Sequence, residues 1–105
     1  PARKILDKNG ILAIASDWNA GLAPMGNMIT QASILATFQK LTTAEVLAGI
    51  TFRAAKALNL NDRGILKKGM KADFVVFETD NFQNILYNQG SLVASEVYID
   101  GERII

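Results

Sequence analysis

Apolar residues change their spacing along the chain, and the changes mark its predicted elements. Residues 2–7 have the character of a helix end, with Asn9-Gly10 as a stop signal. Residues 11–15 are a continuous apolar run, which is typical of a strand covered on both faces. The run ends at Ser16-Asp17. We therefore expect the Asp17 carboxylate at the carboxyl end of a buried strand, the edge where α/β folds bind ligands.

Helical spacing follows a loop at residues 17–27. Residues 28–39 place apolar side chains three or four apart, which predicts an amphipathic helix. Thr42 and Glu45 fit a capping box, in which each side chain bonds the other residue's amide. A second helix is predicted to begin there, to bury a stripe on one face, and to close at Asn59.

Short strands dominate the remainder of the chain. Residues 74–77 read as a strand of high β propensity, and residues 81–88 as a loop or one irregular helical turn. Asp100-Gly101 predicts a two-residue hairpin between residues 97–99 and 102–105. A lone buried strand with two helices, followed by short antiparallel strands, indicates a βα unit from a larger α/β structure and an antiparallel edge module.

Composition narrows the possible chemistry. The chain has 105 residues, is 50% hydrophobic and carries a formal net charge of +1 without a basic cluster, so we expect neither nucleic-acid nor anionic-lipid binding. We also expect no membrane span and a cytoplasmic location. The absence of Cys and His nearly excludes a closed zinc site, a Ser/His triad and a Cys/His pair within this chain. Catalysis would need its carboxylates, Lys or Tyr, or residues from another polypeptide.

The loop after the predicted strand resembles the amidohydrolase superfamily, whose metal-dependent hydrolases use a (β/α)8 barrel. Within it, Ser16-Asp17-Trp18-Asn19-Ala20-Gly21-Leu22-Ala23-Pro24 is most similar to the imidazolonepropionase family. The resemblance covers nearly the whole chain. Its other motifs are Leu41-Thr42-Thr43-Ala44-Glu45, Thr51 to Leu58, Asp62-Arg63-Gly64, Gly69 to Val76, Asn81-Phe82, Leu86 to Gly90, and Asp100-Gly101.

The resemblance implies a fold and a division of the chain. The implied fold class is α/β, with the C-terminal βα portion of a (β/α)8 barrel and strands of a small β-sandwich-like side domain. Residues 1–63 would supply the last barrel strand with its loop and helices, and residues 64–105 part of the side domain. The remaining metal ligands would come from the rest of the same polypeptide. This chain alone is therefore expected to be inactive.

The resemblance also assigns roles to three loop residues. Asp17 would bind a single Zn or Fe ion and exchange a proton with the attacking water. Asn19 and Gly21 would contact a small cyclic amide substrate. Local structure offers a plainer interpretation of each: Asp17 as a capping or turn residue, and Asn19 with Gly21 as an Asx turn containing a glycine of positive φ.

The loop also departs from the family pattern. Ala20 replaces the usual Pro, and Leu22-Ala23 replaces a Ser-rich pair, so expected hydroxyl contacts are lost. Trp18 is larger than the family residue; it either stacks on a substrate ring or fills space beside the barrel mouth.

The departures in the loop keep other functions open. A dihydroorotase-like enzyme acting on another cyclic amide is the closest alternative. A noncatalytic α+β binding module is a further one. A homodimer is also compatible with the sequence.

Overall fold

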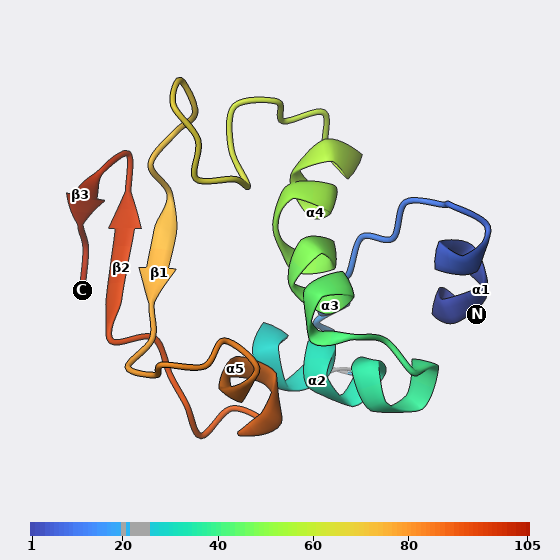
Figure 1. The fold of residues 1–105 in the computed structure, drawn as a ribbon. Helices are drawn as coiled ribbons and strands as arrows, with labels where there is room; N and C mark the ends of the chain where they lie inside the picture. Colours follow the sequence, from blue (N-terminus) through green and yellow to red (C-terminus); the bar gives the residue numbers. More distant parts are fainter. Residues whose placement is uncertain (20, 22–25) are drawn as a thin grey trace.

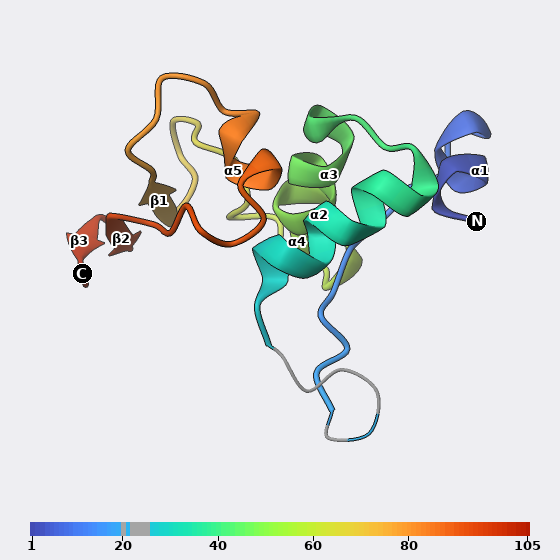
Figure 2. The same ribbon diagram turned by 90° about the horizontal axis from the view of Figure 1, so that it is seen from below.

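The computed structural model describes residues 1–19, 21 and 26–105. Five helices and one small sheet make up this part of the chain, which has an α/β architecture (Figure 1). The sheet stands on one side of the helices and the first helix on the opposite side (Figures 1 and 2). The elements are α1 (Ala2–Asp7), α2 (Met28–Gln39), α3 (Thr43–Ile50), α4 (Phe52–Ala57), β1 (Phe74–Val76), α5 (Asn84–Tyr87), β2 (Glu96–Ile99) and β3 (Glu102–Arg103).

Asparagines in the left-handed conformation end two helices. Asn9 and Asn59 both have a φ of 58°. After α1, the Asn9 amide donates to the Leu6 carbonyl at 2.9 Å and the Gly10 amide donates to the Ile5 carbonyl at 2.8 Å. This pair of bonds is the Schellman arrangement, which satisfies carbonyls at a helix end. The predicted stops at Asn9-Gly10 and Asn59 are confirmed.

The single helix predicted from Thr42 to Asn59 is wrong, because Thr51 divides it. Thr51 adopts φ −119° and ψ −105°, between α3 and α4. Its hydroxyl donates to the Leu47 carbonyl at 2.6 Å, a side-chain bond that competes with the backbone ladder. The Gly49 carbonyl accepts from the Ile14 amide at 2.9 Å, a bond outside the helix. The helical pattern thus continues across residue 51 while the hydrogen bonding does not.

The strand predicted for residues 11–15 is not formed within the described residues. Ile14 is buried, but Ile11 is 57% exposed, and no other strand pairs with this segment. A strand needs neighbours to bond its amides and carbonyls, and here the Gly49 carbonyl bonds the Ile14 amide. Residues 11–15 therefore have the composition of a strand covered on both faces, but no neighbouring strand in the described residues pairs with them.

The C-terminal sheet matches its prediction closely. Its antiparallel strands have the order β1-β2-β3. The Phe74 ring stacks on its cross-strand partner Tyr98, with centroids 4.4 Å apart. Asp100 and Gly101 have φ values of 52° and 81°, as a type I′ hairpin requires. The described residues contain this one sheet, so the second layer of a sandwich-like domain remains a prediction.

The buried core joins residues from both halves of the chain. Ile14, Ala32, Val46 and Leu86 form one cluster. Leu86 belongs to α5, the irregular turn that was one of two predictions for residues 81–88, and its carbonyl accepts from the buried Ser33 hydroxyl at 2.8 Å. Residues 64–105 therefore contribute Leu86 to a core that residues 1–63 otherwise form, and the boundary between residues 63 and 64 stays a prediction.

Many large apolar side chains lie on the surface. Examples are Phe38 on α2, Leu58 after α4 and Leu66 in the following loop, which are 79%, 71% and 69% exposed. Among the described residues, no helix is long and apolar enough to cross a membrane. Apolar exposure on this scale is typical of surface that another part of a protein covers.

Candidate functional site

One glycine fixes the segment that leads to Asp17. At Gly49, a Cβ atom would lie 2.9 Å from Ile14 Cδ1 and 3.4 Å from the Leu12 carbonyl oxygen. Glycine permits this approach without a shift of the Ile14 side chain, and the Ile14 amide bonds the Gly49 carbonyl here. From this anchor on α3 the chain continues away from the helices (Figure 2). Asp17 follows Ile14 by three residues and begins the loop.

Asp17 lies exposed in a left-handed conformation. Its φ is 49°, a region that Asp tolerates better than most residues other than glycine. The backbone thus turns sharply at the residue that is predicted to bind a metal ion. The Asp17 carbonyl accepts from Asn19 Nδ2 at 2.7 Å.

Asn19 connects the three predicted site residues. While Nδ2 bonds the Asp17 carbonyl, Oδ1 accepts from the Gly21 amide at 3.0 Å. The second bond is an Asx turn, as the plainer interpretation predicts. A positive φ, of 49°, lies at Asp17 in this turn. These two bonds bring the three predicted site residues into one turn.

Trp18 lies between Asp17 and Asn19 in the sequence. The indole is 72% exposed and lies against Gly26, near the end of the loop. A Cβ atom added at Gly26 would be 3.4 Å from Trp18 Cδ2. The sequence departures at Ala20, Leu22 and Ala23, and the predicted contacts there, lie outside the described residues.

The described residues supply one candidate metal ligand in this loop. They contain no group of three or more His, Cys, Asp or Glu side chains that could hold an ion. Asp17 fits a metal site as a single exposed carboxylate on a sharply turned loop, because hard and borderline cations bind carboxylate oxygen. Any centre there would need its remaining ligands from outside the part of the chain that the structure describes.

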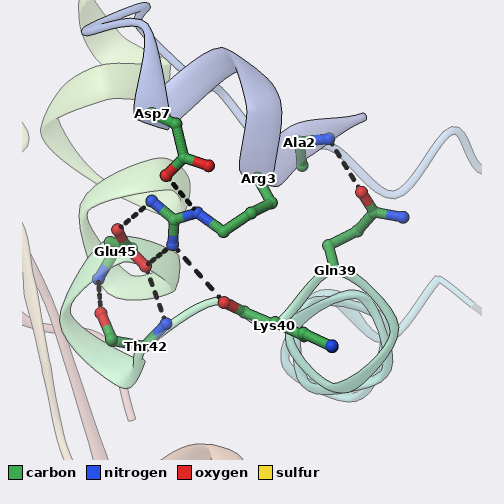
Figure 3. A network of polar contacts seen from close by, with 7 residues as sticks. All are labelled: Ala2, Arg3, Asp7, Gln39, Lys40, Thr42 and Glu45. Atoms are coloured by element: carbon green, nitrogen blue, oxygen red, sulfur yellow. Dashed lines mark hydrogen bonds and ion pairs between the residues drawn. The ribbon is translucent and has the colours of Figure 1, made fainter.

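The sequence did not predict a polar network that joins α1 to the segment between α2 and α3 and to α3 itself (Figure 3). The Arg3 guanidinium donates to both Glu45 carboxylate oxygens at 2.9 Å and to Asp7 Oδ1 at 2.7 Å. Glu45 also accepts from the Thr42 amide at 2.8 Å, so the predicted capping box is confirmed. Hydrogen bonds from Arg3 and from the Thr42 backbone lower the pKa of Glu45 to about 2. This network holds α1 against α3 and is structural.

A groove that none of the Asp17-loop residues lines lies elsewhere on the structure. A groove of about 600 Å³ separates α3 and α4 from the sheet, and its wall is mostly apolar, including Ile50, Leu58, Ile65 and Val97. None of the three predicted site residues lines it. We interpret the groove as part of the uncovered apolar surface described above.

Comparison with known proteins identifies the family. The model of the amidohydrolase family matches residues 1–105, so the chain belongs to this family. Members of the amidohydrolase superfamily generally bind a metal. Among solved structures, an amidohydrolase from Thermotoga maritima MSB8 superposes with a TM-score of 0.76 at 26% identity, over 97% of this chain and 24% of that one.

Imidazolonepropionases are among the curated proteins that the chain is similar to. The enzyme of Deinococcus radiodurans is 35% identical over 104 residues, which are 99% of this chain and 26% of that protein. The enzyme of Staphylococcus aureus strain JH9 is 36% identical over 104 residues, or 99% of this chain and 25% of that protein. The chain therefore spans about a quarter of the length of these relatives.

Proposed function

We propose that the whole protein is a metal-dependent hydrolase that opens a cyclic C–N bond, with imidazolonepropionate as its substrate. The observation that carries the proposal is the similarity to imidazolonepropionases over 99% of the chain, together with an exposed acid in the matching loop. In this proposal the uncovered apolar surface packs against the rest of the same polypeptide. The whole protein would be located in the cytoplasm.

In the proposed architecture, other strands of the whole protein pair with the apolar residues 11–15. Residues 11–15 would be the last strand of a (β/α)8 barrel, within a unit formed by residues 1–63, and residues 64–105 would belong to the small side domain. This proposal is supported by the Ile14–Gly49 bond, which ties the run to a helix as barrel strands are covered by helices. Asp17 would then lie at the carboxyl end of the strand, where barrel enzymes bind substrates.

Each loop residue has a task in the proposed reaction. The Asp17 carboxylate would help to hold the ion. It accepts a proton from the attacking water and donates it to the departing ring nitrogen as the ring C–N bond breaks. Asn19 and the Gly21 backbone hold the ring of the substrate. A single Zn or Fe ion would supply Lewis acidity, which lowers the pKa of water and polarises the carbonyl.

A dihydroorotase-like activity is the second candidate. It is favoured by one observation, the replacement of the family's Pro and Ser-rich positions by Ala20, Leu22 and Ala23. Apolar residues at these positions remove hydroxyl donors that would bind the imidazolone substrate, so the site would suit another cyclic amide that is held by other contacts. The noncatalytic module receives no such support, since the family match covers the whole chain.

Turnover by the full-length protein tests the proposal. We expect ring opening of imidazolonepropionate at a kcat/KM at least about a hundredfold above that for dihydroorotate, a range that pocket contacts commonly supply. The reverse order would support the second candidate. No hydrolysis of either compound by metal-loaded protein would contradict the proposed function.

A further inference from the structure

The indole of Trp18 is supported by the backbone of its own loop. The nearest ring atom to a Cβ built at Gly26 is Cδ2 at 3.4 Å, followed by Cε2 and Cε3 at 3.7 Å. Cδ2 is a ring-fusion carbon surrounded by ring atoms, so an atom closest to it approaches from a face of the indole. Gly26 therefore lies against one face, and the side chain is still 72% exposed.

The Trp18 ring lies between two predicted site residues in the sequence. Trp18 directly follows Asp17 and directly precedes Asn19, whose side chain bonds the backbone at Asp17 and at Gly21. A proton acceptor, a flat apolar surface and an amide group thus occupy three consecutive positions. Flat rings attract one another by offset stacking, and indole offers the largest face among protein side chains.

We propose that Trp18 determines substrate specificity by stacking on a planar cyclic amide and thereby discriminating against puckered rings. This inference rests on the proposed function and deepens it, because it names the ring shape that the site accepts. A flat five-membered ring can lie parallel to the indole along its whole area. A puckered lactam touches the indole with few atoms and gains less from the contact.

A packing role makes different predictions from a stacking role. If the rest of the polypeptide covers Trp18, its replacement leaves a cavity and lowers the melting temperature. If Trp18 stacks on the substrate, its replacement weakens ring binding while the melting temperature is retained. Trp18→Leu preserves apolar volume without a π face, and Trp18→Phe preserves a smaller face.

Calorimetric binding to the full-length protein separates these roles. Hydantoin serves as the planar cyclic amide and piperidin-2-one as the puckered one, with Tyr87→Leu as a control at an aromatic residue that is 83% exposed on α5. We expect Trp18→Leu to weaken hydantoin binding about tenfold, Trp18→Phe about threefold, and piperidin-2-one binding by less than about twofold. The control should bind both rings like the wild type.

Three outcomes would overturn the stacking role. They are equal losses for both rings in Trp18→Leu, a lower melting temperature with unchanged ring binding, and no binding of hydantoin by the wild type. Trp18-dependent hydantoin binding in a protein that hydrolyses no cyclic amide would keep the stacking role and contradict the proposed function instead.

Discussion

Arg3 and Glu45 lie 42 positions apart in the sequence and form a two-point ion pair, with both N–O distances at 2.9 Å. The pair joins α1 to the N-terminus of α3, where Glu45 also completes the capping box. Planar guanidinium and carboxylate groups match in such a fork, which gives the contact geometric specificity. The chain before Gly10 is thereby fixed relative to α3, the same helix that anchors Ile14.

The Glu45 contacts predict a specific pH dependence of stability. The pKa of Glu45 is about 2 in the folded chain against an ordinary value of 4.5. Its stabilising contribution is therefore fully present above about pH 4.5 and is lost as the pH falls toward 2. In the full-length protein, Glu45→Gln should lower the denaturation midpoint at pH 6, and the difference from wild type should shrink below pH 4.5.

The control for this prediction is Glu78→Gln, which removes an exposed carboxylate elsewhere in the chain. It should leave the denaturation midpoint at pH 6 nearly unchanged. A wild type and a Glu45→Gln variant with equal midpoints at pH 6 would show that the ion pair contributes nothing to stability.

Gly49 should tolerate no large side chain. Gly49→Val places a Cβ atom 2.9 Å from Ile14 Cδ1 and 3.0 Å from Cγ1, and we expect a loss of about 1–3 kcal/mol of unfolding free energy. Ile14→Val removes Cδ1, so it should cost less in the Gly49→Val background than in the wild type. Denaturant unfolding of the four proteins measures this coupling, and simple additivity would contradict the close contact.

Substitutions of Asn59 test whether its left-handed backbone conformation is needed to end α4. Its φ of 58° is costly for a β-branched residue and free of cost for glycine. We expect Asn59→Val to destabilise the protein by about 1–2 kcal/mol and Asn59→Gly to change stability by a few tenths of a kcal/mol at most. Thermal unfolding compares the two variants, and equal stabilities would mean that the chain end after α4 rearranges.

Metal removal should abolish the proposed activity. Dialysis of the full-length enzyme against a chelator is expected to reduce turnover to background, because the proposed chemistry depends on Lewis acidity. Addition of Zn or Fe should restore turnover in proportion to bound metal. Full activity of a protein shown to be metal-free by elemental analysis would exclude the metal-dependent mechanism.

The sequence predicted those elements whose hydrogen bonds are local. The capping box at Thr42, the stops at Asn9 and Asn59 and the Asp100-Gly101 hairpin all depend on neighbours a few residues apart. These features were confirmed because the residue types themselves impose the local backbone conformation.

Long-range contacts explain what the sequence did not predict. The break at Thr51 lies close to the Gly49 carbonyl, which accepts a hydrogen bond from the amide of Ile14, 35 positions earlier. The spacing of apolar residues does not predict a hydrogen bond between residues so far apart in the sequence. Arg3 likewise has no sequence signal for Glu45. The strand at residues 11–15 depends on partner strands that the described residues do not supply. For the site, the sequence indicated Asp17, Asn19 and Gly21, and the Asn19 bonds bring them into one turn.

The central claim is that Asp17 transfers the proton in hydrolysis, and kcat of the Asp17→Asn variant tests it most directly. Asn keeps the size of the side chain and its tolerance of the left-handed conformation, but it cannot accept the proton. The full-length variant should lose at least about a hundredfold in kcat at an unchanged melting temperature, while Asp80→Asn, at an exposed acid elsewhere, stays fully active. A kcat for Asp17→Asn within about twofold of wild type would contradict the account.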